Sequence, residues 1–270
     1  MGSKDRLYAD IMAVHPEVTG SCNLVIVKQP DNSTVKFVVD CGLFQERQYS
    51  KNNESLPFIP ANIDFCLVTH NHVDHVGRLP FMVNKGFAKE IYMTETTAKL
   101  LPLALEDSHK VLRDVAKRQN HSPLYSEADV SQTMRLIHPC KYNETIQIRP
   151  NIKATFFMNG HLMGASSILV QISWEGYETI NLFFSGDYSN KNMFFDVPDL
   201  PDWVLELPLT VVQESTYGDM DSYEVTSCFK QNVLKCLEHG GTLLHQSFRW
   251  DVRRKFCMRL NACRTMVLWT

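Results

Sequence analysis

Long apolar runs are missing from this 270-residue sequence, and none approaches the roughly 20 residues that a membrane-spanning helix requires. The first 18 residues, MGSKDRLYADIMAVHPEV, also lack the continuous apolar core of a secretory signal peptide. The eight cysteines include no C-x-x-C pair, and Cys22, Cys41 and Cys66 lie in strand-like apolar runs, where free cysteine behaves as a small hydrophobic residue. We therefore expect no membrane insertion and a reducing, cytoplasmic location.

An excess of positive charge is also missing. The net charge is −3, so no global positive field recruits nucleic acid, and any affinity for phosphate must come from a local site. The composition, 44% hydrophobic and 21% charged, is that of an ordinary globular protein with a sizeable core. The length favours one large domain, or one and a half.

Short β-branched and aromatic runs alternate with helical patterns along the chain. Strands are predicted at 22–29, 35–42, 63–69, 144–149, 152–158, 167–173, 179–187 and 209–215. Helical spacing spans 95–119, with Pro102 as an early kink, and 222–241, which two glycines close. Ser126 and Asp129 form a capping-box signature before a helix that ends near Ile137. This alternation predicts a layered α/β fold.

Ligand-type side chains crowd into LVTHNHVDHVGRLP (67–80), directly after an apolar run. In an extended segment, residues two apart point the same way, so His70 and His72 can converge on one ion. Asp74 and His75 follow where the chain turns towards a helix and can face a second ion. Histidine nitrogen and carboxylate oxygen suit zinc in a catalytic site. Four such residues in six positions favour a metal site over an exposed polar loop.

Two distant stretches add candidates of the same kind. His161 lies between glycines in NGHLMGAS (159–166), and Asp187 ends an apolar strand in FFSGDYS (183–189). Each alone is weak evidence, because a histidine or aspartate after a strand is usually a loop residue. Together with the first cluster they predict ligands that several strand ends deliver to one sheet edge.

The motif H-x-H-x-D-H at 70–75, with His161 and Asp187, resembles the metallo-β-lactamase fold. VVDCGLFQ (38–45) supplies Asp40, matching the aspartate that this superfamily holds beside its metals. Three further stretches, EVTGSCNLV (17–25), ALEDSHK (104–110) and ESTYGD (214–219), resemble the β-CASP group of RNA- and DNA-processing nucleases, in particular its cleavage-and-polyadenylation-factor-like members. The resemblance runs from about residue 11 to 244. It implies an αββα sandwich, incomplete, over 11–217 and the start of an inserted β-CASP domain over 218–244.

The same resemblance implies roles for single residues. One Zn²⁺ would be held by His70, His72 and His161, a second by Asp74 and His75, with Asp187 bridging the two. Asp40 would lie beside the metals and orient a ligand or the nucleophilic water. Asp74, Asp187 and Glu214 form the implied catalytic set, with Glu214 handling protons or orienting a histidine. The family has one more ligand histidine and one catalytic histidine near its C-terminus, and neither has a match here.

These roles imply a zinc-dependent hydrolase of phosphodiester bonds. The resemblance favours single-stranded RNA as the substrate, and physics permits it, since a flexible strand can thread to a recessed metal site that a duplex could not enter. Two alternatives stay open, a small-molecule ester or thioester hydrolase and a catalytically inactive scaffold subunit. Assembly into a homo-oligomer or a processing complex is left open as well.

The segment 245–270 departs from the resemblance. After HGGTLL (239–244) the family would continue with proline, an apolar stretch and a Gly-Arg pair that opens a helix, whereas this tail is rich in arginine. A basic RNA-binding extension is one interpretation. The other is a frameshift, because codons rebuilt one base out of frame permit L-G-R-S-E-K-V-L-Y-E, a family-like helical string. We therefore predict a frameshift near residue 244 and a 270-residue product that is poorly soluble and inactive as a nuclease.

Overall fold

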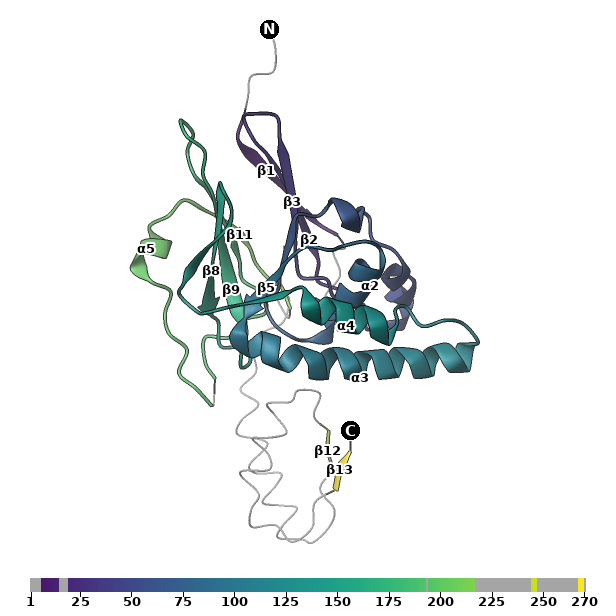
Figure 1. The fold of residues 1–270 in the computed structure, drawn as a ribbon. Helices are drawn as coiled ribbons and strands as arrows, with labels where there is room; N and C mark the ends of the chain where they lie inside the picture. The colour runs from purple at the N-terminus through teal and green to yellow at the C-terminus, as the bar shows by residue number, and fades with distance from the viewer. Residues whose placement is uncertain (1–5, 15–18, 193, 217–243, 247–266, 270) are drawn as a thin grey trace, which may run out of the picture. The chain divides into compact units, whose positions relative to one another are not determined.

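The computed structural model describes residues 6–14, 19–192, 194–216, 244–246 and 267–269, and its chain divides into two compact units, 1–216 and 217–270 (Figure 1). The first unit contains two sheets. The first sheet has the order β1-β2-β3-β4-β5-β6, formed by Tyr8–Ala13, Asn23–Lys28, Thr34–Val39, Phe65–Leu67, Ile91–Thr94 and Ile137–Cys140. The second has the order β11-β10-β9-β8-β7, formed by Leu209–Val212, Ile180–Phe184, Ser166–Ile172, Ile152–Met158 and Thr145–Arg149.

Strand direction places several strand ends together. In the first sheet β3, β4, β5 and β6 are parallel, and in the second β8 runs in the same direction as β10 and β11. The helices are α1 to α5, formed by Val73–Val76, Leu79–Asn84, Glu95–Gln119, Glu127–Arg135 and Asp202–Leu205. Two 3₁₀ helices, η1 and η2, span Arg47–Glu54 and Pro60–Asn62.

The first unit has four layers. The sheets lie face to face, with α2, α3 and α4 beside the first sheet and α5 beside the second (Figure 1). Strand β4 shows why its run is apolar throughout: Phe65 and Leu67 pack between the sheets, whereas Cys66 packs towards the helices. A third cluster joins Phe157 of β8 to Val204 of α5. This is the αββα sandwich that the resemblance implied.

Local signals set the helix boundaries. Helix α3 begins after Thr94, whose side chain accepts the N–H of Thr97, and ends at Asn120 in a left-handed conformation. The predicted capping box at α4 is confirmed, with Ser126 and Asp129 bonding reciprocally. Cys22, Cys41 and Cys66 are buried free thiols, as expected. Strands β1, β5 and β6 were not predicted, and the structure adds them.

The second unit is described only at β12, Leu244–Gln246, and β13, Val267–Trp269, which pair in parallel. The predicted helix at 222–241 and most of the predicted frameshifted tail lie outside the described residues. The domain limits inferred from the resemblance therefore stay a prediction. Within the described residues, no helix has both the length and the apolar character needed to cross a membrane.

Candidate metal centre

Strand ends from both sheets supply the candidate site. His70 and His72 lie in the loop between β4 and α1, and His161 follows β8. Asp187 follows β10, and Asp40 follows β3. Because these strands run parallel within each sheet, their carboxyl ends bring together side chains that are far apart in the sequence.

The ligand atoms of His70, His72, His161 and Asp187 all lie within 4.8 Å of one another. Nδ1 of His72 is 3.1 Å from Nε2 of His70 and 3.1 Å from Nε2 of His161. Nitrogens at this spacing suit ligands that each stand about 2.0–2.1 Å from one shared ion. Three imidazoles and one carboxylate therefore fit a divalent metal. The three imidazoles, of His70, His72 and His161, are the ones that the resemblance grouped around one ion.

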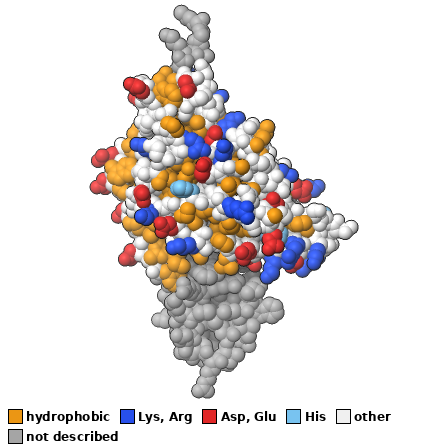
Figure 2. Space-filling view, in the orientation of Figure 1, with side chains coloured by type: hydrophobic (Ala, Val, Ile, Leu, Met, Phe, Trp, Pro, Cys, Tyr) orange, Lys and Arg blue, Asp and Glu red, His pale blue; other side chains and the backbone are white. Residues whose placement is uncertain are grey.

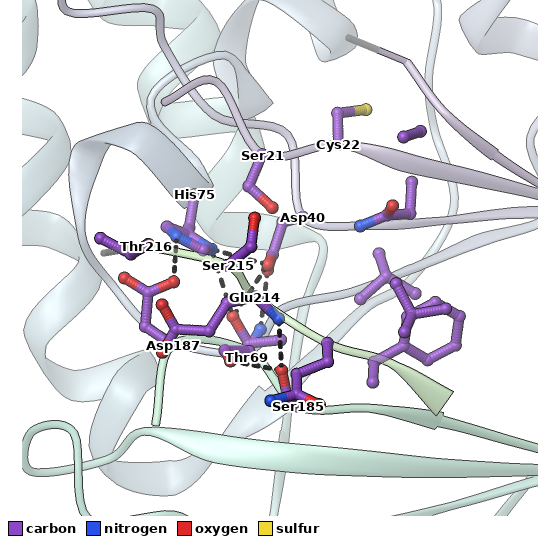
Figure 3. A pocket seen from close by; sticks show the side chains of 17 residues that line it. Ser21, Cys22, Asp40, Thr69, His75, Ser185, Asp187, Glu214, Ser215 and Thr216 are labelled. Carbon is purple, nitrogen blue, oxygen red and sulfur yellow. Dashed lines mark hydrogen bonds and ion pairs between the residues drawn. The ribbon is translucent and has the colours of Figure 1, made fainter. Parts of the chain in front are cut away.

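Asp187 presents one oxygen to each side of the site. Its Oδ2 is 3.6 Å from Nε2 of His161 and 3.9 Å from Nε2 of His70. Its Oδ1 is 3.2 Å from Nε2 of His75 (Figure 3). A carboxylate placed between two sets of histidine nitrogens has the geometry that a bridging ligand needs.

Asp40 supports the site from behind. Its Oδ2 lies 2.8 Å from Nδ1 of His75 and 2.8 Å from the hydroxyl of Thr69, and its Oδ1 accepts the Thr69 N–H at 2.8 Å (Figure 3). Asp40 is 2% exposed and has a φ of +63°, a left-handed backbone that aspartate tolerates better than most residues. A strained, buried carboxylate held by three donors is a common feature of functional sites.

The charges of the site reinforce one another. Burial alone would raise the pKa of Asp187, but the hydrogen bond and positive charge of His75, with His161 and His72, hold it at about 2. Burial alone would lower the pKa of His75, but the Asp40 and Asp187 carboxylates raise it well above its ordinary value. Without metal, a cationic His75 therefore sits between two carboxylates, and a metal ion would take the place of its Nε2 proton.

Asp74 lies in the first turn of α1, half-buried, and does not belong to the converging group found among the described residues. Its backbone is held tightly, because its carbonyl accepts the N–H of Ser21 at 2.8 Å. The assignment of its carboxylate to a second ion stays a prediction.

Two residues that the sequence did not single out organise the loops. The side chain of Asn159 donates to the carbonyls of Ser185 and Asp187 at 3.0 and 2.9 Å and accepts the N–H of His161 at 3.3 Å. It thus ties the His161 loop to the Asp187 loop. Thr69 links the ends of β3 and β4 through Asp40. Each lies at a strand end, and that position is the only sequence signal that marks it.

A cleft of about 260 Å³ opens beside the site and is lined by Asp40, His75, Asp187 and Glu214, among others (Figure 3). Oε1 of Glu214 accepts the N–H of Tyr188 at 2.8 Å, and the Glu214 N–H donates to the hydroxyl of Ser185 at 3.0 Å. Glu214 therefore holds the loop that carries Asp187. Its predicted role in catalysis stays a prediction.

The face drawn in Figure 2 carries side chains of both charges. Figure 2 shows acidic and basic side chains interspersed on the face in view.

Comparison with known proteins identifies the family. The profile of the metallo-beta-lactamase superfamily matches residues 18–142. Ribonuclease TTHA0252 of Thermus thermophilus is 32% identical over 237 residues, which cover 86% of this chain and 49% of that protein. Endoribonuclease ysh1 of Aspergillus fumigatus is 26% identical, with 86% of this chain and 26% of that protein covered. Cleavage and polyadenylation specificity factor subunit 3-II of Arabidopsis thaliana is 25% identical, with coverages of 93% and 40%.

Residues 18–142 therefore carry a metallo-β-lactamase domain, and the predicted resemblance to the β-CASP RNA-processing nucleases is confirmed. It spans about half the length, or less, of the relatives named above. The metal-ligand chemistry of the site and the family together imply a divalent metal.

Proposed function

We propose that the chain provides the zinc-binding part of a ribonuclease that hydrolyses phosphodiester bonds in single-stranded RNA. The observation that carries the proposal is the position of Asp187, whose two oxygens face His161 and His75 separately. In this proposal His70, His72 and His161 hold one ion, Asp74 and His75 hold the second, and Asp187 bridges them. Two zinc ions would supply Lewis acidity towards an attacking water and the phosphodiester.

The chain's own residues prepare this site. Asp40 keeps a proton on Nδ1 of His75, which directs Nε2 towards Asp187. Asn159 and Glu214 fix the loop that carries Asp187, so its carboxylate needs little reorganisation when metal enters. The cleft beside Glu214 is open, and a flexible single strand can enter it more readily than a duplex.

Three relatives support RNA as the substrate, because their names describe a ribonuclease, an endoribonuclease and a subunit of a cleavage and polyadenylation factor. The last name also supports assembly into a processing complex. We place the chain in this class rather than among small-molecule hydrolases, since the relatives named above act on RNA or belong to an RNA-processing factor.

The test incubates a longer version of the protein, which spans the full length of its relatives, with labelled single-stranded RNA, with and without a chelator, and measures bound zinc in the same samples. We expect about two zinc ions per chain and cleavage that the chelator abolishes. Zinc near zero would favour an inactive scaffold. Thioester turnover well above RNA cleavage would favour a small-molecule hydrolase.

A further inference from the structure

Thr69 stands between the buried Asp40 carboxylate and one of the candidate ligands. Its hydroxyl oxygen is 2.8 Å from Oδ2 of Asp40 and 3.0 Å from Nδ1 of His70. Both Thr69 and Asp40 are almost fully buried, at 1% and 2% exposed. The three groups therefore form a short chain of hydrogen bonds that runs from β3 to the loop after β4.

The direction of these hydrogen bonds follows from the chemistry of the groups. A carboxylate only accepts, so the single hydroxyl proton of Thr69 goes to Asp40. The Thr69 oxygen is then an acceptor towards His70, and Nδ1 of His70 must carry the proton. This leaves the lone pair on Nε2 of His70, the atom that faces Nδ1 of His72 at 3.1 Å.

The Asp40 carboxylate also fixes the tautomer of His75, in this case by a direct hydrogen bond. Oδ2 of Asp40 lies 2.8 Å from Nδ1 of His75, so that nitrogen is the donor and Nε2 points to Asp187 at 3.2 Å. One buried carboxylate thus contacts one histidine of each ligand set, the first through Thr69 and the second without an intermediate.

Thr69 has little freedom to adopt another arrangement. Its N–H is bound to Oδ1 of Asp40, and its carbonyl accepts the N–H and the hydroxyl of Ser166 at 2.9 and 3.1 Å. A Cβ built on Gly186 would come within 2.9 Å of the Thr69 Cβ, so the neighbouring loop packs closely against this side chain. The residue is fixed on both its backbone and its side-chain faces.

We infer that Thr69 is a positioning residue that fixes the tautomer of His70. Asp40 then prepares both ligand sets for metal, because it acts on His70 through Thr69 and on His75 by direct contact. The inference rests on the metal-binding part of the proposed function. It predicts an asymmetry: loss of the Thr69 hydroxyl affects the ion held by His70, whereas a change at Asp40 affects both ions.

The test measures zinc affinity by chelator competition, and the visible absorption of the cobalt(II) forms, for Thr69→Val, Thr69→Ser and Asp40→Asn. Supporting hydrogen bonds to metal ligands are typically worth about 10–100-fold in metal affinity. We expect Thr69→Val to bind one of the two ions about 10–100-fold more weakly, with an altered cobalt spectrum, and to bind the other ion normally. Thr69→Ser, which keeps the hydroxyl, should bind both ions like the unmodified protein, and Asp40→Asn should weaken both.

Thr133→Val in α4 is the matched control, because Thr133 is also fully buried and its hydroxyl also donates, to the Asp129 carbonyl at 2.8 Å. Its zinc affinity should not change. Far-UV circular dichroism of the metal-free variants reports folding. If Thr69→Val does not fold, the other two variants replace it. In that case the inference is supported when folded Asp40→Asn binds both ions more weakly and Thr69→Ser binds them normally. Binding of both ions by Asp40→Asn with the affinities of the unmodified protein overturns it.

The experiment distinguishes failure of the proposed function from failure of the inference about Thr69. An unmodified protein that binds no zinc would contradict the proposed function. An unmodified protein that binds two ions, beside a folded Thr69→Val with the same two affinities and the same cobalt spectrum, would overturn the inference alone.

Discussion

At the scale of single residues, the proposed bridging role of Asp187 predicts how many ions bind. Replacement by asparagine keeps the shape but removes the charge and one of the two acceptor oxygens that face His161 and His75. Groups that only support ligands cost about 10–100-fold in metal affinity when lost, so a bridging ligand should cost at least as much. We expect the Asp187→Asn variant to bind one zinc ion per chain or fewer instead of about two, and a longer version that spans the full length of the relatives to lose RNA cleavage. Metal analysis after dialysis checks this, and unchanged zinc content would show that Asp187 does not bridge.

The pair of Asp187 and His75 also predicts a pH dependence of the metal-free protein. The pKa of Asp187 falls from 3.8 to about 2, so its contribution is complete above about pH 4 and is lost as pH falls towards 2. The pKa of His75 is raised above 6.5, so its contribution is complete below pH 6.5 and is lost as pH rises through the folded value. The free energy of unfolding should therefore contain a contribution that is greatest between about pH 4 and 6.5.

Urea unfolding of chelator-treated protein between pH 3 and 8 measures this dependence. The Asp187 part is on the order of 2 kcal/mol at most, since one pKa unit corresponds to about 1.4 kcal/mol. Asp187→Asn should flatten the acid side of the curve, and an acid side as steep in the variant as in the unmodified protein would contradict the assignment.

At the scale of elements, the four-residue helix α1 depends on the loop after β3. A helix this short is not stable alone, and backbone hydrogen bonds from Cys41 to His75 and from Leu43 to Val73 hold it in place. Arg78 is fully buried and adds a bond to the Gly42 carbonyl. A Cβ built on Gly42 would collide with the Asp74 carbonyl, so only glycine fits there.

Gly42→Ala should therefore push α1 away from the loop and displace Asp74 and His75. Overpacking of this kind typically costs about 1–3 kcal/mol of stability, and we expect lower zinc content as well. Gly176→Ala is the control, because it adds the same methyl group to a glycine but no atom lies within 4 Å of the Gly176 Cβ position. Thermal unfolding and metal analysis of the two variants check the prediction, and normal zinc content in Gly42→Ala would contradict it.

The elements also show which features the sequence could predict. Helices α3 and α4 follow from local spacing and caps, and strand β8 beside the site follows from a short run of β-branched and aromatic residues. Strand β5 was missed because it is four residues long, and its pairing with β4 and β6 comes from elsewhere in the chain. Thr69 and Asn159 were missed for a related reason, since their partners lie 26 to 29 positions away.

At the scale of the first unit, the site joins the two sheets. His70, His72 and His75 follow β4 of the first sheet, whereas His161 and Asp187 follow β8 and β10 of the second. An ion held by both groups would link layers that otherwise meet through apolar packing. A ligand that binds only the folded state stabilises it by about 2.7 kcal/mol at a free concentration one hundred times its Kd.

Zinc should therefore raise the thermal unfolding midpoint of the protein, and a chelator should lower it. His161→Ala removes one of the two ligands, His161 and Asp187, that the second sheet would give to the first proposed ion, so its midpoint should respond less to zinc. His138→Ala, an exposed histidine on β6 outside the converging group, should respond like the unmodified protein. Calorimetry of the chelator-treated and zinc-loaded forms compares the three proteins. Equal shifts in His161→Ala and the unmodified protein would mean that zinc does not link the sheets through His161, and the four-layer packing alone would then account for the stability of this unit.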